Sequence, residues 1–595
     1  MAILKLKFNT MKNKMMTRFV SLLGAVAMVS MVVVVSGCNS DWDTQESLSK
    51  AEEQQGLVFT MAEEQFGDDV EVRALAKPDV VDTVDVADGV EAEVAIERDV
   101  AEERALTRAL KTDNHYTIVA FETGTGKEKG RIKGRFNLAT GAFVADVGTP
   151  QYIVLSPGEH CDFVCYSDQY ISREGNTLTI SLPNAHRALA GKATNVEILP
   201  QRKQSVTFRL QRFGARVRTK LVAPLPLPSN MGAKIVSANN AVPRAVTLNM
   251  VSWSTANLNN GTLTAAEQNF AGAPVYNEGG YSFNTMLSTG YAYVLSGTRS
   301  EQLSLSFTRG ALYNQALASK PSVRFNSGKT FVAGGSYVIR MKLLPKYKYL
   351  FNDGRVGYLK TPGRTGFVPI ALVVGNGLAI ALWDVESGGQ LAWHTFYGFV
   401  NQCNPRAIVE RGVSSDEDYR VAINDPETGI NWTWVAHRYS GATYAQVKAN
   451  EKGFFPAFYH CAHFDTELVQ KYCKGKGLAS NVSGYRRWFL ASVNPWVLVY
   501  TAISLQPRTS FSHRGYWNKF LLHKAFRDAG GTPLKTNDGY WTSAESATKA
   551  YDLNNVVSRH TMWPHDGWLS VGASGSSGDA ANFRFYVRPF VSYLN

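Results

Sequence analysis

A short stretch rich in histidine and cysteine offers the clearest side chains for chemistry. His460, Cys461 and His463 lie within four residues, and Cys473 follows ten residues later. Thiolates and imidazole nitrogens are the ligands that zinc prefers in proteins. The spacing matches no standard zinc motif and the neighbours are aromatic, so core packing or a disulfide is favoured over a metal site. We therefore expect no metal and no cofactor.

Catalytic and nucleotide-binding signatures do not occur where a strand and a helix would position them. No GxSxG, P-loop, HExxH or GxGxxG motif has a suitable context. Gln506 and Pro507 precede Arg508, where calcium-dependent lectins need an acid, so no calcium site is expected. We expect a protein that is not an enzyme. The alternative is a surface enzyme of the formylglycine-generating or hydrolase class.

Three tryptophans near the carboxyl end could contact a ligand. Trp563 and Trp568 flank Pro564, His565, Asp566 and Gly567, and Trp541 lies in a Tyr-Trp-Thr-Ser-Ala-Glu block. A glycan could stack on such rings, which present a flat apolar face. The alternative is local packing in a glycine-rich loop.

The amino terminus reads as an export signal. Its basic residues are Lys5, Lys7, Lys12, Lys14 and Arg18. An apolar stretch over 19–35 follows and ends in Ser36-Gly37-Cys38, which resembles a lipobox, so residues 1–37 are interpreted as a signal peptide and Cys38 as the diacylated residue. The alternative is a membrane anchor with a chance cysteine. Asp41 and Asp43 resemble the surface-export signal of Bacteroidia lipoproteins.

Export implies an oxidising compartment, in which cysteines can pair. Five cysteines follow Cys38, and an odd number cannot all pair. Cys161 and Cys165 lie four apart in a strand pattern, on one face but too distant to bond. Two of Cys403, Cys461 and Cys473 could form a disulfide.

Composition and charge divide the chain. Its 595 residues predict about three to four domains, and 50 Gly, 26 Tyr and 30 Phe favour β structure. Residues 39–104 hold 20 acidic and five basic residues, whereas residues 105–595 hold 30 acidic and 52 basic ones. The acidic leader could be a solvated tether or a removable pro-segment that covers the body. The positive charge is scattered along the body, and the export signal directs the protein out of the cytoplasm, so nucleic acid is not an expected partner.

A strand pattern lies inside the acidic leader. Val90, Ala92, Val94 and Ile96 alternate with mostly acidic residues, which gives one apolar and one polar face. Arg104 and Arg108, each followed by Ala, come before the first strand of the body. Removal of the 90–96 strand would leave an unpaired sheet edge and an apolar groove. The alternative is a disordered or helical Val/Glu stretch.

The body from 115 to about 345 shows the short strands of β-sandwiches. We expect strands over 116–121, 152–155, 162–166, 177–182, 205–210 and 216–221. The prolines of the stretch 223–228 lack the backbone N–H groups that donate the regular hydrogen bonds between strands. This stretch therefore predicts a bend or a sheet edge near a domain junction.

Two stretches of the body resemble a known family. Residues 155–166 (Leu-Ser-Pro-Gly-Glu-His-Cys-Asp-Phe-Val-Cys-Tyr) are similar to a fimbrillin turn and aromatic strand, and 190–192 with 206–218 to the segment between its first two domains. With the lipobox and the Arg-Ala steps, residues 38–345 resemble the Bacteroidia (type V pilus) fimbrillins. The resemblance implies two transthyretin-like β-sandwiches, cleavage after Arg108 or Arg104 by an Arg-specific protease, and a displaced strand at 90–96 that a neighbouring subunit replaces.

The last 250 residues differ from the body. The stretch 372–383 predicts a strand pair around Gly375-Asn376-Gly377, and 518–529 predicts a helix that ends at Gly530. The block at 540–545 and the closing 585–591 resemble a C-type-lectin-like module of bacterial surface proteins, and fimbrillins with such an extra module are typically tip or accessory subunits. Residues 585–595 read as its closing strand, which leaves no free strand to donate.

These observations predict a mostly β protein in five parts. They are the signal peptide (1–37), an acidic propeptide (38–108), two transthyretin-like β-sandwiches (109–215 and 216–345) and an α+β C-type-lectin-like domain (346–595). We expect a fimbrial tip or accessory subunit, first in the outer-membrane lipid and then in the fimbrium. Its partners would be sister subunits, the Arg-specific protease and a host or bacterial surface ligand. The alternative is a lipid-anchored glycan-binding protein that never polymerises.

Overall fold

Alternating apolar residues along short segments produce a structure that is mostly β. The computed structural model describes residues 56–67, 82–99, 114–200, 203–239, 241–263, 265–319, 322–325, 328–360, 366–395, 402–408, 416–438, 442–507, 514–548, 556–574 and 582–594. All of them lie in one compact unit of the chain, 56–595. Among them, no helix combines the length and the apolar character needed to cross a membrane.

The first sheet contains the first strand of the body and a strand from the acidic leader. In sheet order its strands are β1 (Gly56–Glu63), β11 (Lys203–Arg212), β10 (Leu189–Glu197), β7 (His160–Ser167), β4 (His115–Glu122), β5 (Glu128–Phe136) and β6 (Phe143–Ala145). Thr60 of β1 also bridges to Ala142, next to β6, so the two ends of the sheet approach each other around an apolar interior. Phe59, Phe163 and Phe208 pack together there.

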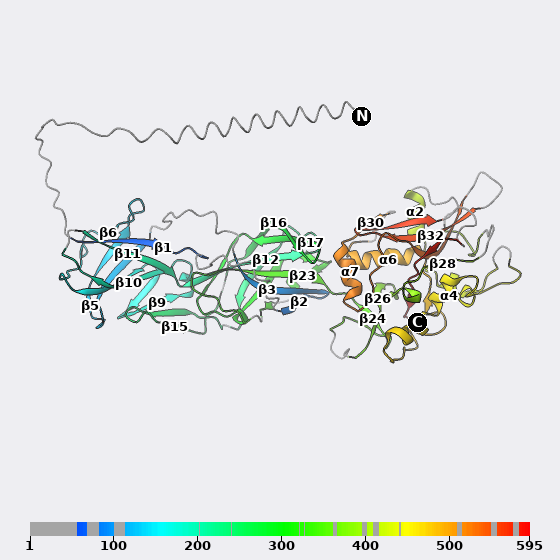
Figure 1. Ribbon diagram of the computed structural model, residues 1–595, viewed down its shortest axis with the longest axis horizontal. Helices are drawn as coiled ribbons and strands as arrows, with labels where there is room; N and C mark the ends of the chain where they lie inside the picture. The colour runs from blue at the N-terminus through cyan, green and yellow to red at the C-terminus, as the bar shows by residue number, and fades with distance from the viewer. Residues whose placement is uncertain are drawn as a thin grey trace, which may run out of the picture. The chain divides into compact units, whose positions relative to one another are not determined.

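The second sheet combines two strands of the acidic leader with strands of the body and covers a hydrophobic core. Its order is β2 (Asp82–Ala87), β3 (Val90–Arg98), β23 (Ser336–Pro345), β12 (Gly214–Ala223), β17 (Tyr281–Ser288), β16 (Gln268–Glu278), β13 (Gly232–Ser237), β19 (Leu303–Arg309) and β22 (Val323–Arg324), with β18 (Ala292–Leu295) also on β12. Figure 1 shows β3 beside β23 and β12. Every residue of β23 is buried, because it has a strand on each side and a core beneath it.

A smaller sheet joins the two stretches of the body. Its order is β15 (Thr255–Leu258), β14 (Ala245–Asn249), β9 (Thr177–Ser181) and β8 (Ile171–Glu174). The body strands expected from the sequence are confirmed except for 152–155. Tyr152 and Val154 are 74% and 79% exposed and belong to no strand, because no neighbouring segment pairs with them.

The carboxyl-terminal part mixes helices with two sheets and a short strand pair. One sheet is β25 (Val356–Gly357), β24 (Tyr349–Phe351), β26 (Pro369–Gly375), β27 (Leu378–Ala381), β35 (Phe590–Ser592) and β29 (Trp488–Phe489); the other is β30 (Arg514–Tyr516), β33 (Trp568–Ser574), β32 (Val556–Pro564) and β31 (Tyr540–Thr548); β28 (Leu391–Ala392) pairs with β34 (Arg584–Phe585). The helices include α2 (Asp416–Asn424), α3 (Ile430–Trp434), α4 (Pro456–Ala462), α5 (Phe464–Glu467), α6 (Val493–Ser504) and α7 (Lys519–Arg527).

Local signals account for several of these elements. The predicted strand pair is β26 and β27, joined where Asn376 and Gly377 adopt positive φ. The predicted helix is α7, whose first turn is capped by the Asn518 side chain, which accepts from the backbone of Phe520. The proline-rich stretch follows β12, and Leu225 packs against both the core of the second sheet and a core of the carboxyl-terminal part. Leu225 thus connects the two cores, and the division of the chain into domains at this point stays a prediction.

Candidate functional site

We define the amino-terminal segment as the described residues 56–67 and 82–99, which hold β1, β2 and β3. β1 pairs in parallel with β11, from Gly56 opposite Lys203 to Glu63 opposite Leu210. Its Phe59 and Met61 are buried in the interior of the first sheet. β1 therefore closes this interior between β11 and β6.

β3 occupies the position that the sequence assigned to a displaced strand. It pairs antiparallel with β23 from Val90 opposite Pro345 to Arg98 opposite Tyr337, and with β2 on its other side. Val90, Ala92, Val94 and Ile96 are 0%, 0%, 2% and 7% exposed. The predicted alternation is confirmed, and these four side chains belong to the largest part of the body's core. Whether β3 leaves its place stays a prediction.

The face of β3 opposite the core carries carboxylates that meet cations of β23. Arg340 Nε lies 2.7 Å from Glu97 Oε1, and Lys342 Nζ lies 3.5 Å from Glu93 Oε2. Both cations are nearly buried, at 2% and 8% exposure of their side chains. The Arg340 guanidinium lies 5.2 Å from the Tyr276 ring centroid, an aromatic contact that helps to exclude water.

Along the rest of the segment, acidic side chains likewise meet basic side chains of the body and of the carboxyl-terminal part. Its carboxylates pair with cations of the rest of the chain in Glu63–Arg212, Glu64–Arg209, Asp85–Lys346, Glu91–Lys360, Glu91–Lys524, Glu93–Lys342, Glu97–Arg340 and Asp99–Arg218. In each pair the segment supplies the negative charge. The described amino-terminal segment therefore complements in charge the basic residues on which it packs.

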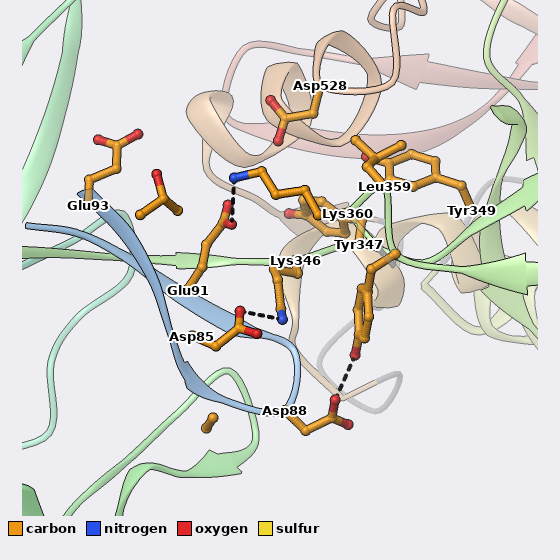
Figure 2. Close-up of a pocket in the computed structure, with 13 residues that line it drawn as sticks. Asp85, Asp88, Glu91, Glu93, Lys346, Tyr347, Tyr349, Leu359, Lys360 and Asp528 are labelled. Atoms are coloured by element: carbon orange, nitrogen blue, oxygen red, sulfur yellow. Dashed lines mark hydrogen bonds and ion pairs between the residues drawn. The ribbon is translucent and has the colours of Figure 1, made fainter. Parts of the chain in front are cut away.

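A cleft of about 800 Å³ separates the β2–β3 hairpin from the carboxyl-terminal part (Figure 2). Its acidic lining comes mostly from the hairpin, with Asp528 of the carboxyl-terminal part added, and its basic lining comes from Lys346 and Lys360. Figure 2 shows Asp85 directed toward Lys346, at 2.7 Å, and Glu91 directed toward Lys360, at 3.9 Å. The cleft is thus crossed by ion pairs that link the hairpin to residues beyond the second sheet.

Two buried cations of this interface, Lys524 and Arg212, carry a positive charge in the folded protein. Burial opposes protonation of Lys524, but the carboxylates of Asp528 and Glu91 outweigh it and raise the pKa of the ammonium. Burial lowers the pKa of Arg212, yet an arginine side chain stays protonated in proteins. If the segment left, the positive charge of Arg212 would remain.

The three tryptophans expected to contact a ligand occupy different environments. Trp541 is 0% exposed and donates from Nε1 to the Leu391 carbonyl at 2.8 Å, so it is a core residue and its prediction as a ligand contact is wrong. Trp563 and Trp568 are half-buried. The Trp568 ring already stacks on His565 at 3.6 Å between centroids and lies 4.5 Å from the Arg514 guanidinium.

The histidine and cysteine stretch is part of the packing. Among the described residues, Cys161, Cys165, Cys403, Cys461 and Cys473 are all buried and unpaired, so the suggested disulfide does not form. Burial raises the pKa of Cys461 well above its ordinary value, which keeps the thiol protonated. His460 contacts Glu386, with 2.9 Å between Nδ1 and Oε1. In the described part of the chain, no group of three His, Cys, Asp or Glu side chains could hold a metal.

A buried polar network that the sequence analysis missed lies between β31 and α4. Lys448 Nζ donates to Asn404 Oδ1 at 3.0 Å, and Glu545 pairs with Arg559 at 3.1 Å. Burial lowers the pKa of Lys448 to about 8. Glu545 accepts from the backbone of Asn404, and Lys448 and Glu545 have no exposed surface. The network therefore holds the local fold together.

Three residues that carry the maturation hypothesis, Cys38, Arg104 and Arg108, lie outside the described residues. Sequence reasoning also missed β1 and the cations that face the segment. One signal was available for the cations. Arg216, Arg218 and Lys220 on β12, and Arg340 and Lys342 on β23, recur every second residue inside otherwise apolar strands, a pattern that places charge on one buried face.

Comparison with known proteins found no matching family model and no matching curated protein. Three similar solved structures are a candidate cell adhesion protein from Bacteroides uniformis ATCC 8492 (18% identity, TM-score 0.27, 41% of this chain and 95% of that one), a fimbrial assembly protein from Parabacteroides distasonis ATCC 8503 (12%, 0.25, 38% and 83%) and a fimbrial protein from Bacteroides ovatus ATCC 8483 (10%, 0.21, 91% and 100%).

Proposed function

We propose that this protein is a tip or accessory subunit of a surface fimbrium. It would be exported as a lipoprotein acylated at Cys38 and cut after Arg104 or Arg108 by an Arg-specific protease. A strand from a neighbouring subunit would then replace the amino-terminal segment. Arg108 is the favoured cut because it lies nearer to β4.

The observation that carries this proposal is the placement of β1, β2 and β3. These strands complete two sheets and fill part of the core, yet all of them precede residue 100, so one cut before β4 separates them covalently from the body. Their departure would expose the edges of β11 and β23 together with apolar side chains beneath them. An unpaired edge beside an apolar groove is the geometry that accepts an added strand.

The carboxyl-terminal part supports an accepting rather than a donating role. β35 is paired with β27 on one side and with β29 on the other, so it is held inside a sheet. A strand held in this way is not available for donation to a neighbouring subunit. The carboxyl-terminal part, interpreted as a C-type-lectin-like module, would meet a host or bacterial surface ligand, with Trp563 and Trp568 as its proposed contacts.

The experiment is N-terminal sequencing of the protein recovered from shed filaments. We expect a mature N-terminus at Ala109 or Ala105, and loss of both processing and polymers in the double variant Arg104→Ala/Arg108→Ala. Lys111→Ala is the matched control, because it removes a nearby base that an Arg-specific protease does not use. An intact acylated Cys38 on every copy, with no polymer, would instead favour the lipid-anchored glycan-binding protein.

A further inference from the structure

We propose that the strand which replaces β3 is an acidic, extended peptide from another chain, with carboxylates placed to meet Arg218, Arg340 and Lys342. This inference rests on the proposed function and adds the chemistry of the partner. It follows from the uniform polarity of the ion pairs between the amino-terminal segment and the rest of the chain.

Departure of the segment would remove carboxylates that pair with buried cations of the body. The Arg218, Arg340 and Lys342 side chains are 7%, 2% and 8% exposed, and they form ion pairs with Asp99, Glu97 and Glu93 of the segment. Lys342 would keep its contact to Glu278 of β16. A buried charge without a counter-charge is strongly unfavourable. A purely apolar strand would therefore fill the groove badly, however well it matched the core.

The register specifies the pattern that the partner needs. Val94 and Ile96 face the core opposite Met341 and Ile339, whereas Glu93 and Glu97 project from the other face. The ladder continues through Asp99, whose amide donates to the Ser336 carbonyl at 2.9 Å. A replacement strand in this register carries apolar residues at the positions of 90, 92, 94 and 96, and acids at those of 93, 97 and 99.

The source of such a strand is another chain. Residues 105–595 are basic overall, and β35, the last strand described, carries no carboxylate and is paired on both sides. Arg218 and Arg340 lie on strands covered by neighbouring side chains, so a flat membrane or a nucleic acid duplex does not reach them. An extended chain that lies in the place of β3 does.

The test uses the full chain with a site for a sequence-specific protease inserted between Arg104 and Arg108. After cleavage, the protein is mixed in mild denaturant with an excess of a fluorescent peptide of sequence 82–99. A second peptide carries Glu93→Gln, Glu97→Gln and Asp99→Asn, and a third carries Val94→Ser and Ile96→Ser. We expect uptake of the native peptide, and at least about 100-fold weaker binding of the neutral peptide, because three charge-assisted contacts are lost.

The outcomes separate the two proposals. If the neutral peptide binds as well as the native one, the acidic-partner inference is wrong while strand exchange stands. If no peptide enters the cleaved, folded protein, strand exchange itself fails and both proposals fall. A charge swap adds a second readout on the protein side. Arg340→Glu should reject the native peptide and accept one with Glu97→Arg, whereas Arg299→Glu, a cation that pairs with the body's own Glu301, should change neither.

Discussion

Asp99 and Arg218 form a two-point ion pair that fastens the end of β3 to β12. Arg218 donates from Nη2 to Asp99 Oδ1 at 2.7 Å, and its Nε lies 2.6 Å from Oδ2. The two side chains are only 4% and 7% exposed, and the Tyr291 hydroxyl also donates to Asp99 at 3.2 Å. The amino-terminal segment is thus held by charge as well as by its backbone ladder.

Asp99→Asn should therefore destabilise the uncleaved protein strongly. The amide removes the negative charge and leaves the Arg218 guanidinium buried, so we expect the free energy of unfolding to fall by about 3–5 kcal/mol. Urea unfolding measures this. Glu301→Gln is the control, since its partner Arg299 is 62% exposed and such surface pairs contribute about 1 kcal/mol or less. Equal losses in the two variants would contradict the buried role of Asp99.

Cleavage alone should not release the amino-terminal segment. The β3–β23 and β1–β11 ladders and the buried side chains of both strands remain in place when one peptide bond between Arg104 and Arg108 is cut. We expect the cleaved pieces to elute together in gel filtration and to separate only in denaturant or when a competing strand is present. Spontaneous separation in buffer would mean that the segment is weakly attached.

His115 should make stability depend on pH. Its Nε2 lies 2.6 Å from Asp146 and its Nδ1 lies 2.6 Å from Asp168. Burial lowers the pKa of this imidazole, but the two carboxylates outweigh it and raise the pKa above 6.5. A raised folded-state pKa stabilises the protein fully below the unfolded value of about 6.5, and this stabilisation is lost as pH rises through the folded pKa.

His115→Gln tests this dependence. The melting temperature of the wild-type protein should exceed that of the variant by most at pH 5 to 6, and the difference should shrink as the pH rises toward 9. Thermal melts across this range provide the measurement. A difference that does not change with pH would show that the imidazole does not gain charge in this setting.

The five cysteines after Cys38 should resist modification while the protein is folded. Burial raises the pKa of Cys403 to about 12 and the pKa of Cys461 well above its ordinary value, so few thiolates exist at neutral pH. Iodoacetamide should modify these thiols only after unfolding, without prior reductant. Rapid labelling of Cys461 in the native protein, or loss of a surface activity in Cys461→Ala, would favour the enzyme hypothesis.

The hydrophobic period of the sequence predicted the elements that depend mainly on neighbouring residues in the chain. The alternation at 90–96 is β3, and the helical pattern at 518–529 is α7 with Asn518 as its cap. Tyr152 and Val154 show where this reasoning fails. Their residue types favour a strand, but a strand needs hydrogen-bonded pairing with a neighbouring segment, and no described segment pairs with them.

An acidic leader with one alternating strand before a basic, β-rich body can be predicted from the amino-acid order alone, because charge and hydrophobic period can be counted along the chain. The folded structure was needed to establish which carboxylate meets which cation, that β1 joins the first sheet, and that Trp541 is a core residue. Glu97 and Arg340 are 243 residues apart, and their contact depends on the register of two strands. That register results from the packing of the whole core, which no local pattern encodes.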